Sequence, residues 1–177
     1  ILDMITEHVK PGVTTETLDT KCFEFADQNS ACIAPLFYKG FPKSVCTSIN
    51  HVICHGIPSS RVLEDGDIVN IDVTVIVDGW HGDTSKTFEV GEVSIKAKKL
   101  VKTTYEAMIK AINVVKEGAH LGDIGSTIQT HVEAEGFSVV QDFCGHGIGQ
   151  AFHKEPNVMH YGEKGTGEKI KEGMIFT

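Results

Sequence analysis

Residues 68–83 read IVNIDVTVIVDGWHGD, and this stretch decides how the chain folds. Apolar residues alternate with other side chains from Ile68 to Val77, which predicts a β-strand. Asp78-Gly79 is a residue pair that two-residue hairpin turns prefer, and a second strand-like run follows it. The stretch is therefore predicted to form an antiparallel β-hairpin.

The turn also predicts the register of this hairpin. Counting back from the two turn residues places Thr74 opposite Asp83 and Ile76 opposite His81. Because side chains two residues apart share one face of a strand, Asp72 lies on the Thr74 face. Asp83 is then a diagonal neighbour of Asp72, roughly 7–8 Å away. His81 falls on the same face and is a candidate supporting residue.

Two carboxylates on a half-apolar sheet face have two explanations. Buried carboxylates are usually paired or bound to a metal, and two of them repel unless a cation lies between them. One or two divalent ions fit, since paired catalytic metals sit about 3.5–4 Å apart. The alternative is a turn aspartate at Asp83 and a hydrogen-bonded structural aspartate at Asp72. The hairpin alone supports both equally.

Composition narrows the class of protein. The 177 residues are enough for one domain with a sizeable core. The net charge of −8 argues against a nucleic-acid partner. No apolar run is long enough to cross a membrane, and no signal peptide is recognisable. Five cysteines without regular spacing suit a reducing compartment, so a cytoplasmic location is expected.

Both ends of the chain look cut. The chain starts at Ile1, within what reads as the end of a helix, and it stops inside the apolar run 174–177 without a turn signal. We therefore expect a single catalytic domain over 1–177 that is incomplete at both ends.

The remaining patterns predict an α+β chain. We expect helices over 13–29, 95–116 and 121–135, strands over 45–53 and 137–143, a loop over 30–44, and an exposed turn over 162–169 before a last strand. In the second helix, an apolar stripe is expected to pack in the core: Val101, Tyr105, Met108, Ile112 and Val115.

Three short segments recur in the same order. Residues 9–12 resemble 115–118, the tripeptide 55–57 matches 146–148, and 63–68 resembles 170–175. This predicts a duplicated unit with halves of about 1–93 and 94–177 and a site between them. Since Asp72 lies six residues after a repeated glycine, the second half predicts a carboxylate at position 179.

The candidate site combines carboxylates and imidazoles: His55, Asp72, Asp83, His146 and His153. Such ligands suit Mn, Fe, Co or Zn more than Ca. The chain has no Cys-x-x-Cys, His-Glu-x-x-His, Gly-x-Ser-x-Gly or phosphate-binding Gly-Lys-Ser/Thr motif. A zinc finger, a zincin, a serine hydrolase and a P-loop enzyme are therefore unsupported.

Six motifs together are specific to one family. They are Lys43–Asn50 (KSVCTSIN), Cys54–Pro58 (CHGIP), Gly66–Val73 (GDIVNIDV), His81–Ser85 (HGDTS), Cys144–Gly149 (CGHGIG) and Phe152–Pro156 (FHKEP). With them the chain resembles the type I methionine aminopeptidases of peptidase family M24, truncated at the C-terminus. The resemblance implies the pita-bread fold, a pseudo-twofold duplicated α/β unit around a curved antiparallel sheet.

The resemblance also implies roles for individual residues. Asp72, Asp83 and His146 are expected to bind two divalent metal ions (Co, Mn, Fe, Ni or Zn), with Asp83 bridging them. His55 and His153 are expected to contact the substrate amide and stabilise the tetrahedral intermediate. The methionine side-chain pocket is expected to be lined by Tyr38, Phe41, Cys46 and Phe152.

The implied activity is metal-dependent removal of N-terminal methionine from peptides and nascent chains, with a small second residue preferred. The expected protein is a monomer that associates transiently with the ribosome. Family members need two glutamates after residue 177, so this chain by itself is expected to be inactive. The alternatives are another pita-bread metallopeptidase, such as a proline-directed one, and a non-catalytic metal-binding fragment.

Overall fold

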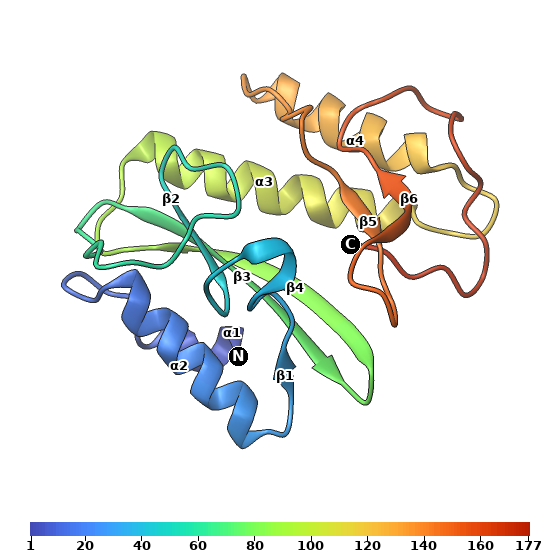
Figure 1. Ribbon diagram of the computed structural model, residues 1–177. Helices are drawn as coiled ribbons and strands as arrows, with labels where there is room; N and C mark the ends of the chain where they lie inside the picture. The colour runs from blue at the N-terminus through green and yellow to red at the C-terminus, as the bar shows by residue number, and fades with distance from the viewer. The chain divides into compact units, whose positions relative to one another are not determined.

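The computed structural model describes residues 1–177. It divides into two compact units, Ile1–Lys98 and Lys99–Thr177. The elements (Figure 1) are α1 Leu2–Thr6, α2 Thr15–Gln28, β1 Cys32–Ile33, the 3-10 turn η1 Tyr38–Gly40, β2 Cys46–Ile49, β3 Ile68–Val77, β4 Trp80–Glu89, α3 Ile95–Val114, α4 Leu121–Ala134, β5 Gly145–Gly147 and β6 Lys154–Val158. None of the helices has both the length and the apolar character needed to cross a membrane.

The predicted hairpin is present with the predicted register. β3 and β4 pair antiparallel along their whole length, with Thr74 opposite Asp83 and Ile76 opposite His81. Asp78 and Gly79 both have positive φ, at 50° and 82°, as a type I′ turn requires. The right-handed twist of the strands suits this turn, so the two residues are enough to set the pairing.

β3 is the central strand of a four-stranded sheet in the first unit. It pairs antiparallel with β4 along its length, with β2 near its start and with the short β1 near its end. Alternation sends Val69, Ile71 and Val73 to one face, where they are buried. Asp72 and Thr74 therefore lie on the other face.

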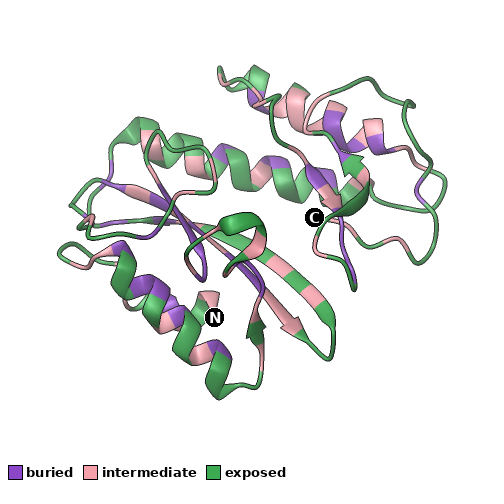
Figure 2. Ribbon diagram, viewed as in Figure 1, coloured by how far each residue is buried: buried purple, intermediate pink, exposed green.

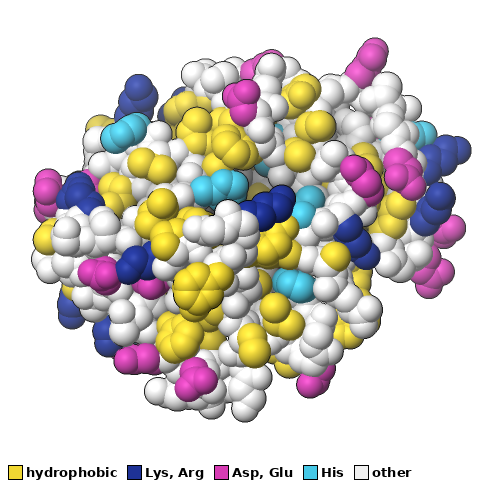
Figure 3. Space-filling view, viewed as in Figure 1, with side chains coloured by type: hydrophobic (Ala, Val, Ile, Leu, Met, Phe, Trp, Pro, Cys, Tyr) yellow, Lys and Arg dark blue, Asp and Glu magenta, His cyan; other side chains and the backbone are white.

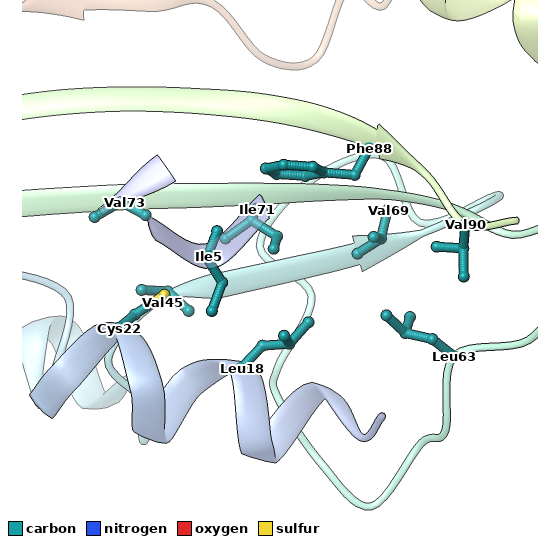
Figure 4. Close-up of a cluster of buried hydrophobic side chains, with 10 residues drawn as sticks. All are labelled: Ile5, Leu18, Cys22, Val45, Leu63, Val69, Ile71, Val73, Phe88 and Val90. Atoms are coloured by element: carbon teal, nitrogen blue, oxygen red, sulfur yellow. The ribbon is translucent and has the colours of Figure 1, made fainter. Parts of the chain in front are cut away.

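The buried face of the sheet forms the core of the first unit. Leu18 and Cys22, one helical turn apart on α2, point at the sheet beside Ile5 of α1 and Phe88 of β4 (Figure 4). Asp19 connects α2 to the sheet, because its Oδ1 accepts hydrogen bonds from the backbone N–H groups of Ser44 (2.7 Å) and Val45 (3.0 Å). This contact holds the start of β2.

The second unit has a smaller core between α3, α4 and the two-stranded sheet β5–β6. Its buried side chains are Ala111, Leu121, Ile124, Val158 and Ile170. The predicted helix over 121–135 is confirmed as α4, and Gly136 ends it with a φ of 84°. The predicted exposed turn over 162–169 is also confirmed.

Four strand or loop predictions were wrong, in part or in full. The strand expected over 45–53 ends at Ile49, because Asn50 turns the chain with a φ of 52° and its side chain binds Asp67 and the Ile68 N–H. Residues 137–143 form no strand, and the loop 30–44 contains β1 and η1. The expected last strand makes only isolated bridges.

The apolar stripe predicted for the core of α3 was also wrong. Tyr105, Met108 and Ile112 are 61%, 46% and 57% exposed, and most of α3 is exposed in Figure 2. The buried positions of this helix are Thr103, Ala107 and Ala111. These three residues are spaced four apart and therefore share one side of the helix, which is its buried side.

Candidate active site

The two predicted carboxylates lie together on the face of the first sheet that points away from the Val69, Ile71 and Val73 side chains. Asp72 is on β3 and Asp83 on β4, both half-buried, and their carboxyl groups share a hydrogen bond. Thr74, directly opposite Asp83, donates its hydroxyl to Asp83 Oδ1 at 2.9 Å. Asp83 therefore lies between a hydroxyl donor and a second carboxyl.

The Asp72–Asp83 pair has the chemistry of a cation site. Burial raises the pKa of Asp72 to about 7, and the charge of Asp83 adds to the rise. Two carboxyl groups at hydrogen-bonding distance need either a shared proton or a cation between them. Carboxylate oxygens are hard ligands for divalent metal ions, so the donor set fits such an ion.

Cys46 lies beside the carboxylates. The pairing of β2 with β3 puts Cys46 opposite Asp72, and the thiol is buried. Burial raises the pKa of Cys46 to about 12, with a further contribution from Asp72. The thiol is therefore neutral and apolar near pH 7, which is compatible with the predicted place in a methionine pocket. All five cysteines are free.

The loop that carries His55 is held against β2. Gly56 donates its N–H to Ser48 Oγ at 3.1 Å and accepts a hydrogen bond from the Thr47 N–H at 2.8 Å. A Cβ on Gly56 would lie 2.2 Å from the Thr47 carbonyl oxygen, so only glycine permits this approach. His55 has a φ of 56° and an exposed side chain.

In the second unit, three predicted site residues form an aromatic cluster. The rings of His146 and His153 have centroids 4.3 Å apart, and Phe152 stacks on His153 at 4.2 Å. His146 Nδ1 lies 3.0 Å from the Gly147 carbonyl oxygen, an arrangement that favours a proton on Nδ1. The other ring nitrogen, Nε2, is then the one suited to bind a metal.

The glycines beside His146 have a packing reason. A Cβ on Gly145 would lie 2.1 Å from the Thr177 carbonyl oxygen, and one on Gly147 would lie 2.2 Å from that of Glu155. His146 N–H and Thr177 Oγ1 are 3.1 Å apart. The backbone on either side of His146 is therefore packed against other segments, at Thr177 and at Glu155.

The aromatic residues of the 30–44 loop are arranged by a tight turn. The N–H of Phe37 donates to the carbonyl of Phe41 at 2.7 Å, and η1 carries Tyr38 between them. Tyr38 and Phe41 are half-buried, whereas Phe37 is 78% exposed. Pocket lining by Tyr38 and Phe41 stays a prediction.

The structure thus gathers the predicted residues in two groups. Asp72, Asp83 and Cys46 lie together in the first unit, and His146, Phe152 and His153 lie together in the second. No group of three or more His, Cys, Asp or Glu side chains is gathered closely enough to hold a metal ion. The assignment of His146 as a ligand stays a prediction.

A hollow of about 660 Å³ beside α3 and α4 is lined by none of the predicted site residues. On the face shown in Figure 3, acidic and basic side chains are interspersed.

Sequence analysis missed Thr74 and Ser48 as site residues. Thr74 is 2% exposed and bonds Asp83, and Ser48 is 4% exposed and holds Gly56. A signal for Thr74 was present, because it is a polar residue in a buried alternating strand, directly opposite Asp83. Ser48 had no such signal, since its partner comes from a loop of irregular conformation.

Comparison with known proteins identifies the family of this chain. The family model described as metallopeptidase family M24 matches residues 1–177. The methionine aminopeptidase of Rickettsia prowazekii is 59% identical over 176 residues, which are 99% of this chain and 68% of that protein. Its crystal structure matches with a TM-score of 0.98 over 99% of this chain and 71% of that one.

Other solved structures extend the comparison. Methionine aminopeptidase from Thermotoga maritima is 36% identical with a TM-score of 0.96, covering 98% of this chain and 70% of that one. Prolidase from Pyrococcus furiosus is 22% identical with a TM-score of 0.81, covering 99% and 50%, and this likeness concerns the fold alone. The expected pita-bread fold and the resemblance to methionine aminopeptidases are confirmed.

Proposed function

The chain belongs to metallopeptidase family M24, and from this premise we propose that it removes the N-terminal methionine from peptides and newly made proteins. One observation supports the proposal: Asp72 and Asp83 are half-buried, interacting carboxyl groups on neighbouring strands of one sheet, a pair of oxygen donors that suits a divalent ion. The similarity to named methionine aminopeptidases over nearly the whole chain gives that site its reaction.

The metal ligands in this proposal are Asp72, Asp83 and His146. They would hold two divalent ions, drawn from Co, Mn, Fe, Ni or Zn, and Asp83 would serve both. When bound, such ions supply a hydroxide nucleophile near neutral pH and polarise the scissile carbonyl. The hydrogen bond from Thr74 and the contact with Asp72 keep the Asp83 carboxylate in place for this task.

The histidines serve the substrate. His55 and His153, both exposed, donate hydrogen bonds to the substrate amide and stabilise the negative charge that develops on its carbonyl oxygen. The ring contact with His146 orients His153, and the tight packing of Gly56 on β2 orients His55.

Substrate selection rests on apolar contacts. Tyr38, Phe41, Cys46 and Phe152 line the pocket for the methionine side chain, and a small second residue is preferred. Such a pocket discriminates by about 1–3 kcal/mol per methylene. The substrate is the N-terminus of a peptide or nascent chain. We further propose a cytoplasmic monomer that associates transiently with the ribosome.

The decisive experiment measures methionine release from Met-Ala-Ser by the protein at its natural length, after chelation and again with added Co²⁺ or Mn²⁺. Activity should disappear with the chelator and return with metal. Asp83→Ala should abolish it, because the carboxylate shared by both ions is lost. Turnover that survives this substitution would refute the role of Asp83.

A second candidate is a proline-directed peptidase. The prolidase from Pyrococcus furiosus shares the fold. Hydrolysis of an Xaa-Pro dipeptide with Met-Ala-Ser left intact would favour this candidate. Metal binding with turnover of neither substrate would instead identify a non-catalytic metal-binding protein.

A further inference from the structure

Thr74 carries a buried hydroxyl group that makes one side-chain hydrogen bond, to Asp83. Thr74 is 2% exposed, and the residues before and after it on β3 are valines, of which Val73 is buried and Val75 is half-buried. A buried hydroxyl without a partner is costly, and valine would fill the same space. The one side-chain hydrogen bond seen for Thr74 runs to Asp83 Oδ1, at 2.9 Å.

The direction of this bond is settled by the chemistry of the partners. An ionised carboxylate only accepts hydrogen bonds, so the Thr74 hydroxyl donates. One donor occupies only one of about four lone-pair directions of the carboxylate. The contact therefore orients Asp83 without using up its capacity to bind a cation.

The backbone around Thr74 is held on both sides. Thr74 faces Asp83 across β3 and β4, and its carbonyl oxygen accepts the Ala34 N–H at 3.0 Å, next to β1. Threonine is also stiff at χ1 because it branches at Cβ. The hydroxyl is thus a fixed donor that restrains the orientation of the Asp83 carboxylate.

We propose that Thr74 is a positioning residue, which fixes the Asp83 carboxylate in the orientation that binds divalent metal. This inference rests on the proposed function, since it assigns Asp83 to the metal site. Partners that orient metal ligands typically contribute about 10–100-fold to metal affinity, and Thr74 is expected to contribute within this range.

The test compares Thr74→Val with Thr74→Ser by titrating Mn²⁺ into the metal-free, natural-length protein in a calorimeter. The valine variant keeps the shape and loses the donor, so its affinity should fall about 10–100-fold. The serine variant keeps the donor and should bind like the wild type. Should the valine variant fail to fold, Thr74→Ala removes the same donor without forcing a branched apolar group beside the carboxylate.

Thr84→Val is the matched control. Thr84 follows Asp83 in β4, is exposed, and by strand alternation points to the opposite face. The same substitution there should leave Mn²⁺ affinity unchanged. A loss of affinity equal to that of the Thr74 variant would overturn the inference.

Three further outcomes separate this inference from the proposed function. Wild-type affinity in a folded Thr74→Val protein overturns the inference. Weak binding by Thr74→Ser also overturns it, because the donor would then not be the cause. If donor loss weakens Mn²⁺ binding while the wild type releases no methionine, the inference is supported and the proposed function is refuted.

Discussion

At the scale of single residues, the candidate site depends on where side chains are absent as much as on where they are present. Gly56, Gly145 and Gly147 each have a backbone carbonyl oxygen within 2.2 Å of the place of a Cβ. Two of them flank His146 and one follows His55. Close backbone packing therefore accompanies two of the three predicted functional histidines, His55 and His146.

The substitution Gly56→Ala tests whether close backbone packing at this position stabilises the fold. The new methyl group would meet the Thr47 carbonyl oxygen, which belongs to a strand and cannot move freely, so the free energy of unfolding should fall by roughly 1–3 kcal/mol. Denaturant unfolding measures the change. Gly82→Ala is the control, because no atom lies within 4 Å of its Cβ position and its φ is not positive. Equal unfolding midpoints for the two variants would contradict the packing argument.

At the scale of elements, strand pairing refines the internal repeat. Val69 of β3 pairs with Ile49, whereas Phe176, its counterpart in the repeat, bridges Gly147. Gly147 therefore corresponds to Ile49, and His146 to Ser48. Residues 55–57 and 146–148 therefore share a sequence but not a structural position, because the two tripeptides lie at different places in the strand pairing of the two units. The repeat halves of about 1–93 and 94–177 stay a proposal.

The start of α4 supplies a pH-dependent element. The Asp123 carboxylate accepts hydrogen bonds from the N–H groups of His120 and Gly165, each at 2.8 Å, and these lower its pKa. Because the pKa of Asp123 is lower in the folded protein than in the unfolded chain, its carboxylate stabilises the fold at pH values above 3.8, the pKa of the unfolded chain. This stabilisation is lost as the pH falls through the pKa of the folded protein.

Asp123→Asn should therefore flatten the loss of stability below about pH 4, where the wild type binds a proton on unfolding. Thermal unfolding of both proteins, measured from about pH 3 to about pH 7, covers the range in which carboxyl groups titrate and shows the difference in stability. Asp142→Asn, at an exposed aspartate with no hydrogen bond seen, should leave the profile of the wild type unchanged. Parallel profiles for wild type and Asp123→Asn would rule out this contribution.

At the scale of the whole molecule, metal binding and stability are linked. A ligand that binds only the folded state stabilises it by about 2.7 kcal/mol at a concentration one hundred times its Kd. Since Asp72 and Asp83 belong to the long hairpin of the first unit, occupancy there should stabilise the fold as well as enable the reaction.

Mn²⁺ or Co²⁺ should therefore raise the thermal unfolding midpoint of the natural-length protein, and a chelator should reverse the rise. Asp83→Asn should remove the metal-dependent shift. Asp78→Asn, at the turn of the same hairpin, should keep it, because Asn-Gly suits a type I′ turn and lies away from the pair. A metal-dependent shift that persists in Asp83→Asn would place the metal elsewhere.

The sequence by itself determined the features with a short-range cause. Alternation and the Asp78-Gly79 turn predicted the register that puts Asp72 and Asp83 on one face, and a repeating apolar stripe predicted α4. Each of these follows from a period or turn preference that operates within a few residues. The family motifs then connected the carboxylates to a reaction.

Only the tertiary structure decided the rest. Asn50 ends β2 through a partner at position 67, and α3 buries its alanines instead of its larger apolar side chains. The Thr74–Asp83 bond is the intermediate case, because the register placed the two residues opposite each other but only packing showed that the hydroxyl is buried and donates. Contacts between distant residues depend on the fit of three-dimensional surfaces, and no local pattern encodes that fit.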